Sequence, residues 1–208
     1  MSSNLPALAS ALPVAAAWSI HGWWLRRRLA AARRDPLSGL PTRAAFQRAA
    51  RRPLARRRPA AVVLVDLDGF KALNDSHGHD AGDDAIRATG QRLTEWTDGL
   101  GVAARLGGDE FAAVIQVDDA DQVRGELTAL HQWLTSPFDH DGRQLTVGAS
   151  IGAYWPPART DLSAALRRAD EAMYAAKRAG GGWRLATGPE PGEPTVNGRC
   201  AGRPGTHS

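Results

Sequence analysis

The sequence predicts one α+β domain, a sandwich with a mainly antiparallel sheet and helices on its faces. The chain has 208 residues, 43% of them hydrophobic and 23% charged, which suits one compact core but not two full domains. Runs typical of strands alternate with segments of helical periodicity. Two strand-like runs are separated only by a Gly-Gly-Asp turn. Such a tight hairpin disfavours a fully parallel, doubly wound sheet.

The body of the chain begins at Asp35-Pro36, because the residue before a proline is biased against helix. A helix is expected over residues 43–52, with Thr42 as its N-cap. Residues 60–67 are a short apolar run with β-branched side chains, which predicts a buried strand. Apolar residues at helical spacing then predict a helix over residues 80–96.

The second half of the body begins with the hairpin. Strands are expected over residues 102–106 and 110–117, because apolar runs flank the glycine turn. Periodicity predicts the remaining elements, which are helices over 121–134 and 162–179 and strands over 145–154 and 183–186. From residue 188 onward, nine of 21 residues are Gly or Pro, so residues 188–208 are expected to be a disordered tail.

The charge of the chain is divided between two regions. Residues 1–60 carry 12 arginines and one acid, whereas residues 61–208 carry 14 basic and 21 acidic side chains. The pI of about 10.0 therefore reflects the N-terminal quarter, and the body is acidic. An acidic body argues against broad capture of DNA or RNA, so no nucleic-acid partner is expected. The single cysteine, Cys200, excludes an intramolecular disulfide.

Residues 5–25 carry no formal charge and are followed by Arg26-Arg27-Arg28. A stretch of this length can cross a bilayer, and the arginines would place its C-terminal side in the cytoplasm. Its alanines and prolines make the hydrophobicity marginal, so a weakly structured leader or a helix that packs on a partner are the alternatives. We expect residues 1–34 to be a membrane anchor and a basic linker helix (26–34), followed by the body over residues 35–187.

Three segments of the body carry candidate chemistry. The first, Asp66-Leu67-Asp68, ends the buried strand, where carboxylates can hold a hard cation. The second is the hairpin turn, where Gly107 and Gly108 allow close approach of a ligand, and Asp109 and Glu110 can reach a metal. Each segment taken alone is better explained as a helix cap or a solvated turn. If the two lie side by side, their carboxylates converge, and the cluster predicts Mg²⁺ with positions left open for phosphate oxygens.

The third segment is residues 74–83. Asn74 offers a donor and an acceptor, and a carboxylate such as Asp83 can accept two hydrogen bonds, which suits the N1–H and N2–H₂ edge of guanine. The alternative is ordinary turn and helix-start chemistry, because Asn, Asp, Ser and Gly favour such positions. A zinc site at His77 and His79 is disfavoured, since no cysteine lies nearby. The chain contains no GxxxxGK[ST] sequence, so it is not a P-loop enzyme.

Residues 105–111 (RLGGDEF) resemble the signature of the GGDEF domain family, the diguanylate cyclases. Other blocks of the chain resemble the family in the same order. They are residues 35–43, residues 66–71 with Asn74-Asp75, Gly78-His79 and Gly82-Asp83, residues 150–152, and residues 169–177. The resemblance covers about residues 35–186.

This resemblance implies a ferredoxin-like fold related to the polymerase palm, with GTP as the substrate. It also implies a homodimer in which each domain holds one GTP. The 3′-hydroxyl of each nucleotide would attack the α-phosphate of the other and yield cyclic di-GMP and two pyrophosphates. Together with the anchor, it places a cytoplasmic catalytic domain at the inner face of the cell membrane.

The resemblance also assigns roles to residues of this sequence. The ligands of Mg²⁺, or of Mn²⁺ in its place, would be Asp66, the Leu67 carbonyl, Asp109 and Glu110. Asp109 or Glu110 would help to deprotonate the hydroxyl. The substrate-binding residues would be Lys71, Asn74, His79, Asp83, Gly107, Gly108 and Lys177. Lys71 and Lys177 are the only lysines in an arginine-rich chain, which favours a specific role at the phosphates.

Two departures from the family pattern bear on activity. Gly180-Gly181-Gly182 stands where the family has Gly-Arg-Asn, so a phosphate-holding arginine is missing unless Arg178 or Arg184 replaces it. Asp98 and Gly101 occupy the places of the R-x-x-D product site, so product inhibition through that site is expected to be absent. The alternative function is a catalytically silent regulatory module that binds GTP or a dinucleotide.

Overall fold

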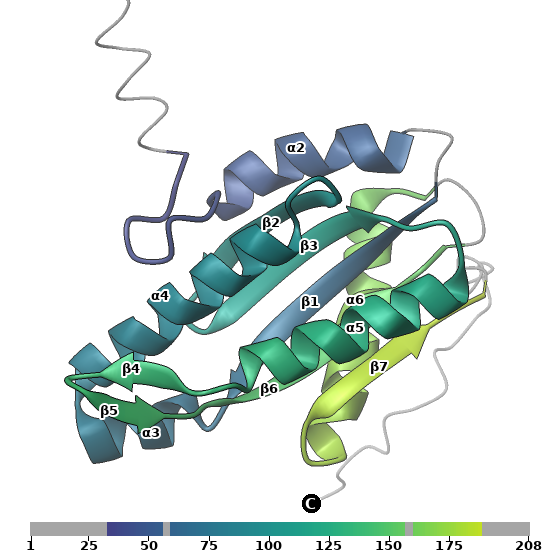
Figure 1. The fold of residues 1–208 in the computed structure, drawn as a ribbon. Helices are drawn as coiled ribbons and strands as arrows, with labels where there is room; N and C mark the ends of the chain where they lie inside the picture. Colours follow the sequence, from purple (N-terminus) through teal and green to yellow (C-terminus); the bar gives the residue numbers. More distant parts are fainter. Residues whose placement is uncertain (1–32, 56–58, 157–159, 189–208) are drawn as a thin grey trace, which may run out of the picture.

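The computed structural model describes residues 33–55, 59–156 and 160–188 (Figure 1). Helices and strands are mixed along this part of the chain. The elements are α2 (Arg43–Ala55), β1 (Ala60–Asp68), α3 (Phe70–His77), α4 (His79–Trp96), β2 (Gly101–Gly107), β3 (Glu110–Gln116), α5 (Ala120–Leu134), β4 (Phe138–His140), β5 (Arg143–Leu145), β6 (Gly148–Tyr154), α6 (Leu162–Arg178) and β7 (Gly182–Ala186).

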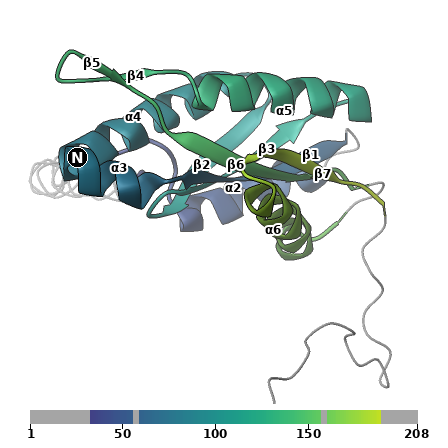
Figure 2. The same cartoon turned by 90° about the horizontal axis from the view of Figure 1, so that it is seen from below.

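A five-stranded sheet with the order β2-β3-β1-β6-β7 forms the centre of the fold. Strand β1 pairs antiparallel with β3 and β6, β2 pairs antiparallel with β3, and only β7 runs parallel to its neighbour β6. The sheet is seen edge-on in Figure 2, with helices on both sides. The predicted α+β sandwich with a mainly antiparallel sheet is therefore confirmed.

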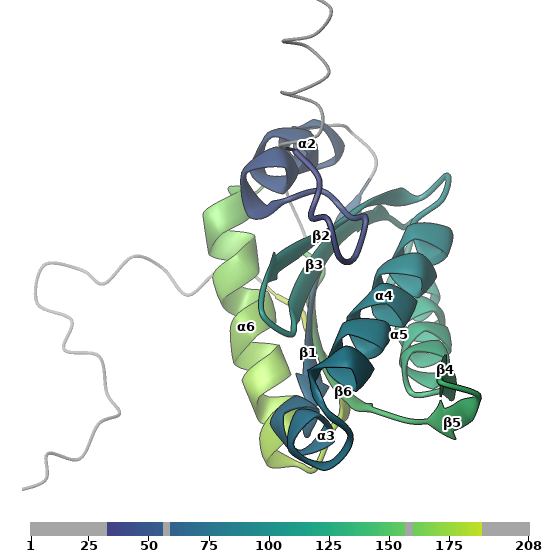
Figure 3. The same ribbon diagram turned by 90° about the vertical axis from the view of Figure 1, so that its left-hand side faces the viewer.

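The two faces of the sheet carry separate hydrophobic cores. Helices α4 and α5 cover one face, and α2 and α6 cover the other (Figure 3). Alternate residues of β1 enter the two cores, with Val63 and Val65 toward α4 and α5, and Val62 and Leu64 toward α2 and α6. Because β1 is buried on both faces, its sequence is a continuous apolar run rather than an alternating one.

Helix α6 approaches the sheet closely at Gly152 of β6. A Cβ atom at this position would lie 2.0 Å from the Ala169 carbonyl oxygen and 2.1 Å from the Met173 nitrogen, so only glycine fits under the helix. One turn beyond Met173, α6 carries Lys177. The close approach therefore brings the Lys177 side chain over the end of β1.

The structure adds a helix and a hairpin to the predicted elements. Residues 70–77, for which the sequence analysis predicted no element, form the short helix α3, which Gly69 and Gly78, both with positive φ, separate from its neighbours. Residues 138–145 form the β4–β5 hairpin, so β6 begins at Gly148 rather than at residue 145. Its turn is Asp141-Gly142, with φ angles of 49° and 75°. Asp-Gly is a strong hairpin signal that the strand prediction overlooked.

The N-terminal predictions lie mostly outside the described residues. The residues outside the description include the candidate anchor (5–25), residues 26–32 of the linker helix and residues 189–208 of the tail. The linker helix is wrong at its end, because Arg33 lies in a turn and Arg34 forms an isolated bridge with Pro41. Within the described residues, no helix is long and apolar enough to span a bilayer.

Candidate functional site

The end of β1 lies beside the β2–β3 hairpin. Asp66 is directly opposite Glu110 of β3 and Ser150 of β6, so the three side chains share the α6 face of the sheet. The Leu67 N–H donates to the carbonyl of Asp109 at 3.3 Å. The two acidic segments that the sequence analysis considered separately are therefore neighbours.

Helix α6 supplies a cation to this group of acids. The Lys177 ammonium donates to both carboxylate oxygens of Asp66, at 3.0 Å for Oδ2. This hydrogen bond raises the pKa of Lys177, burial opposes the rise, and the charges of Asp66, Asp68 and Asp109 add to it. Asp66 is buried, with 9% of its side chain exposed, whereas 51% of the Lys177 side chain is exposed. The lysine can therefore move while the carboxylate stays in place.

Asp68 is held on the same face by small residues. The Ser150 hydroxyl donates to its two carboxylate oxygens at 2.8 and 3.0 Å. A Cβ atom at Gly181 would lie 3.1 Å from Asp68 Oδ2, and one at Gly148 would lie 3.0 Å from Asp68 Cβ. The glycine segment before β7 therefore packs against Asp68, and a side chain at position 181 would have to displace it.

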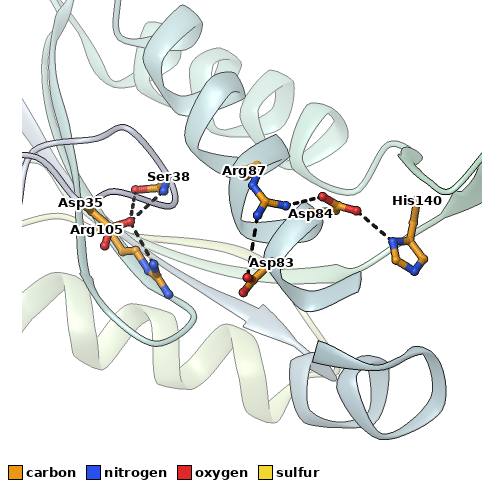
Figure 4. Close-up of polar contacts among 7 residues, drawn as sticks. All are labelled: Asp35, Ser38, Asp83, Asp84, Arg87, Arg105 and His140. Carbon is orange, nitrogen blue, oxygen red and sulfur yellow. Dashed lines mark hydrogen bonds and ion pairs between the residues drawn. The ribbon is translucent and has the colours of Figure 1, made fainter. Parts of the chain in front are cut away.

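The β2–β3 hairpin is fastened to the body by Arg105. Its Nε and Nη2 donate to the carbonyl of Gly108 at 2.9 and 2.7 Å, and its Nη1 donates to Asp35 Oδ1 at 2.9 Å. Asp35 also accepts from the backbone N–H and the hydroxyl of Ser38, both at 2.8 Å (Figure 4). Burial alone would raise the pKa of Asp35, but the hydrogen bonds from Ser38 and Arg105 outweigh it and hold the pKa below its ordinary value.

Glu110 borders a cavity of about 260 Å³ between the hairpin and α6. Its carboxylate lies 3.9 Å from Arg43 Nη2, and both side chains are more than half exposed. Arg43 also donates from Nε to the Leu106 carbonyl at 3.3 Å. Arg167 and Asp170 of α6 line the other side of the cavity. Glu110 is thus accessible, in contrast to the buried Asp66.

The donors at this site fit a hard cation in chemistry but do not form a ready-made cage. Asp66, Glu110 and the Leu67 and Asp109 backbone lie together and offer oxygen, the ligand that Mg²⁺ prefers. The Lys177 ammonium, which donates to Asp66, provides a positive charge where such a cation could bind. Among the residues that the structure describes, no three Asp, Glu, His or Cys side chains are close enough to hold a metal ion by themselves. A bound ion would therefore need further oxygen ligands, such as water or phosphate.

The predicted base-binding residues form a second group on α3 and α4. Asn74 of α3 faces Gly82 of α4, where a Cβ atom would lie 2.0 Å from Asn74 Oδ1. That amide oxygen is buried and has no hydrogen-bond partner within the described part of the chain. Asp83 follows Gly82 directly and is 46% exposed. A polar group on a ligand could therefore meet both side chains.

The two remaining predicted residues stand apart from these contacts. Lys71 lies in the first turn of α3 and His79 is the first residue of α4, and both are exposed. Neither forms an ion pair or a side-chain hydrogen bond with any residue that the structure describes. The structure thus brings together the acids and Lys177, and separately Asn74 and Asp83, but leaves Lys71 and His79 free.

The sequence analysis assigned no role to several residues that form the surroundings of the site. Arg87 of α4 pairs with Asp83 and Asp84, and His140 of β4 bonds to Asp84 (Figure 4). Arg105 and Asp35 were noted only as parts of motifs. His140 and Asp84 are 56 residues apart in the sequence, and Arg105 and Asp35 are 70 residues apart. No periodicity or local motif signals such contacts.

Comparisons with known proteins relate most of the chain to one family. The family described as "Diguanylate cyclase, GGDEF domain" matches residues 32–182. An uncharacterized 19.3 kDa protein of Streptomyces ambofaciens is 50% identical over 177 residues, which cover 83% of this chain and 93% of the relative. Diguanylate cyclase DgcN of Escherichia coli is 37% identical over 148 residues, which cover 69% of this chain but only 36% of DgcN.

Two solved structures resemble the fold. The coiled coil and GGDEF domain of DgcB from Caulobacter crescentus, crystallised with c-di-GMP, has a TM-score of 0.74 and 26% identity, covering 89% of this chain and all of that one. The GGDEF domain of a Pseudomonas aeruginosa protein, TpbB or YfiN, has a TM-score of 0.67 and 34% identity, covering 74% of this chain and 94% of that one.

Proposed function

The chain belongs to the diguanylate cyclase GGDEF domain family, and on this premise we propose that it condenses two GTP molecules into cyclic di-GMP. The observation that carries the proposal is the acidic end of the sheet. There the buried Asp66, the hairpin acids Asp109 and Glu110, and the cation of Lys177 lie together. A phosphoryl-transfer site needs such an arrangement of acids and a cation.

The reaction requires two copies of the domain. Each copy holds one GTP, and the 3′-hydroxyl of each nucleotide attacks the α-phosphate of the other. Each step forms one O3′–P bond, breaks one bond between the α-phosphate and pyrophosphate, and releases one proton. Asp109 or Glu110 accepts that proton, and the exposure of Glu110 beside an open cavity suits it to the task.

Asp66, the Leu67 carbonyl, Asp109 and Glu110 would hold Mg²⁺ or Mn²⁺, which would neutralise phosphate charge when bound. Lys177 then contributes a second positive charge, because its half-exposed side chain can turn from Asp66 to a phosphate oxygen. Gly107 and Gly108, with φ angles of 150° and 53°, allow the phosphates to lie against the hairpin backbone. Lys71 is free to contact the outer phosphates.

The base would lie between α3 and α4. The amide of Asn74 and the carboxylate of Asp83 complement the donors and acceptors of the guanine edge. His79, exposed at the start of α4, would contact the ribose. The unpartnered oxygen of Asn74 supports this assignment, because a buried polar atom without a partner is costly unless a ligand satisfies it.

Product inhibition through the family's R-x-x-D site is proposed to be absent. Asp98 takes the place of the arginine. Gly101 takes the place of the aspartate, and a Cβ atom there would lie 1.8 Å from the Val114 carbonyl oxygen. β2 therefore cannot accept a side chain at position 101 without shifting.

A silent nucleotide-binding module is the second candidate. The Gly180–Gly182 segment favours it, because it packs against Asp68 and offers no cation to the phosphates. The intact acids Asp66, Asp109 and Glu110 favour the enzyme, since a silent copy has no need to keep all three.

Incubation of the full chain with GTP and Mg²⁺, followed by chromatography of the products, separates the two candidates. We expect cyclic di-GMP and pyrophosphate, with a rate per protein that rises with protein concentration as dimers form. Asp109→Ala should lower the rate at least about a hundredfold. The matched control is Asp121→Ala, which removes an acid that is 96% exposed on α5 and should not change the rate. GTP binding without product at high protein concentration would identify the silent module instead.

A further inference from the structure

The segment that joins α5 to the β4–β5 hairpin lies along α4 and is fixed there by Arg92. The Arg92 guanidinium donates to three backbone carbonyls around this segment, those of Leu134 at 3.1 Å, Ser136 at 3.0 Å and Pro137 at 2.7 Å. The contacts join residues more than 40 positions apart in the sequence. They hold the start of the hairpin in one position on α4.

His140, the last residue of β4, fixes the far end of this strand on α4. Its Nδ1 lies 2.9 Å from Asp84 Oδ2, and only 12% of its side chain is exposed. Asp84 is on α4 about two helical turns before Arg92, so α4 holds both ends of the segment. The hydrogen bond with His140 is the main cause of a lowered pKa of Asp84, and burial opposes it only in part.

Asp84 extends this contact toward the base-binding group. Its second oxygen, Oδ1, accepts from Nη1 of Arg87, and Nη2 of the same guanidinium lies 3.8 Å from Asp83 Oδ2 (Figure 4). Arg87 thus lies between two carboxylates, bonded to Asp84 and near Asp83. Because Asp83 and Arg87 are about half exposed, their ion pair has little strength of its own, and its geometry depends on what holds Arg87.

We propose that His140 is a positioning residue for the guanine site, which acts through Asp84 and Arg87 to keep the Asp83 carboxylate directed at the base. The proposal rests on the proposed function of the chain. With His140 in place, Asp84 is the main partner of Arg87, and Asp83 keeps its oxygens for the N1–H and N2–H₂ donors of guanine. Without it, Asp84 can rotate, and Arg87 can pair fully with Asp83 and compete with the base.

The test compares His140→Leu with His140→Asn in the full chain. Leucine removes the ring nitrogen, whereas the asparagine amide can replace Nδ1 as the partner of Asp84. The substrates are GTP and ITP, which lacks the 2-amino group of guanine. Arg143→Gln is the matched control, because Arg143 is the exposed cross-strand neighbour of His140, and within the described residues its side chain forms no hydrogen bond or ion pair with His140, Asp84 or Arg87.

We expect His140→Leu to raise the KM for GTP about three- to tenfold, the equivalent of one hydrogen bond, with kcat changed less than twofold. The preference for GTP over ITP should also fall, by a smaller factor, because ITP keeps the N1–H donor and lacks only the N2–H₂ donor; a purely structural role would not change this preference. His140→Asn and Arg143→Gln should stay within about twofold of the parent. An unchanged preference in His140→Leu, or a loss confined to kcat, would overturn the proposal.

Two further measurements keep the outcomes separate. If thermal unfolding shows that His140→Leu does not fold, Asp84→Asn tests the same step, and it should show the same loss of GTP preference. If the parent makes no cyclic di-GMP, the proposed enzyme fails, but calorimetry with a non-hydrolysable GTP analogue and its inosine counterpart still tests His140. A larger loss of affinity for the guanosine analogue than for the inosine analogue in His140→Leu would support the positioning role, and equal losses, or none, would overturn it.

Discussion

Two hairpins are fastened to the same domain by a carboxylate, yet in different ways. The β2–β3 hairpin is held by the Arg105–Asp35 pair, whose side chains are 14% and 21% exposed. The β4–β5 hairpin is held by His140 and Asp84, and Asp84 shares its carboxylate with Arg87, which is 54% exposed (Figure 4). The first network is screened from solvent, whereas the second reaches the surface at Arg87.

The difference indicates what each network does. Arg105 bonds directly to the carbonyl of Gly108, one residue before Asp109, so the shape of the turn that carries the proposed catalytic acids depends on it. The second network ends at Asp83, which belongs to the proposed base site. Loss of the Arg105–Asp35 network should therefore lower both the catalytic rate and the stability of the fold. Loss of the His140–Asp84 network should lower mainly the affinity for nucleotide.

The largest effect is expected for Arg105→Leu. The variant loses three hydrogen bonds and leaves the Asp35 carboxylate partly buried without its cation. We expect the free energy of unfolding to fall by about 2–3 kcal/mol and cyclic di-GMP synthesis to fall at least about a hundredfold. Urea unfolding and product chromatography measure the two quantities.

Arg124→Leu is the control for this change, because Arg124 pairs only with Asp121 on the exposed side of α5. Its unfolding free energy should stay within about 0.5 kcal/mol of the parent. Normal synthesis by a destabilised Arg105→Leu protein would show that the hairpin keeps its shape without the clamp, and the contrast between the two networks would disappear.

An intermediate effect is expected for Arg92→Met, which retains the aliphatic stem but removes the bonds to three carbonyls. The free energy of unfolding should fall by about 1–2 kcal/mol. The KM for GTP should rise less than in His140→Leu, because the contact of His140 with Asp84 remains. Gln91→Met is the control, since Gln91 is exposed on the same helix and bonds only to Glu95. A drop in kcat larger than the rise in KM would place the β4–β5 hairpin in the chemistry itself.

The sequence predicted those parts of the molecule that depend on local pattern. The apolar run of β1, the glycine turn of the β2–β3 hairpin and the periodicity of α6 each specify one element, and the structure contains all three. The resemblance to the GGDEF family added the expectation that these elements form one fold around one site, which the periodicity of a single sequence does not show. The bond between Lys177 and Asp66 spans 111 residues, and no motif predicted it, because the resemblance assigned Asp66 to the metal and Lys177 to the phosphates.

The elements and contacts that were missed have physical reasons. Helix α3 has only eight residues between two glycines, too few for a periodic signal. The β4–β5 hairpin has three residues in each strand, too few for a period-2 signal, and its Asp141-Gly142 turn lies just before the predicted strand over residues 145–154. His140 and Asp35 act through single partners on distant elements, so their roles depend on tertiary packing.

The smallest effect is expected for Asp35→Asn, and it separates charge from shape in the β2–β3 network. The amide can still accept from Ser38 and Arg105, so at pH 7 the loss of the negative charge should cost about 1 kcal/mol of unfolding free energy. In the parent, the hydrogen bonds of Ser38 and Arg105 outweigh burial and hold the pKa of Asp35 below its ordinary value of 3.8. A lowered pKa stabilises the fold above the unfolded value, and this contribution is lost as the pH falls through the folded value.

The difference in stability between the parent and Asp35→Asn should therefore be constant from pH 7 to about pH 5 and should close below about pH 3.8. Arg105 stays charged over this range, so its titration does not complicate the result. Asp121→Asn, at an exposed site, should show no comparable difference at any pH. Urea unfolding at a series of pH values measures these differences. If the difference stays undiminished down to the lowest pH at which both proteins remain folded, the clamp depends on hydrogen-bond geometry rather than on charge, and the β2–β3 network then resembles the His140 network more closely than its burial suggests.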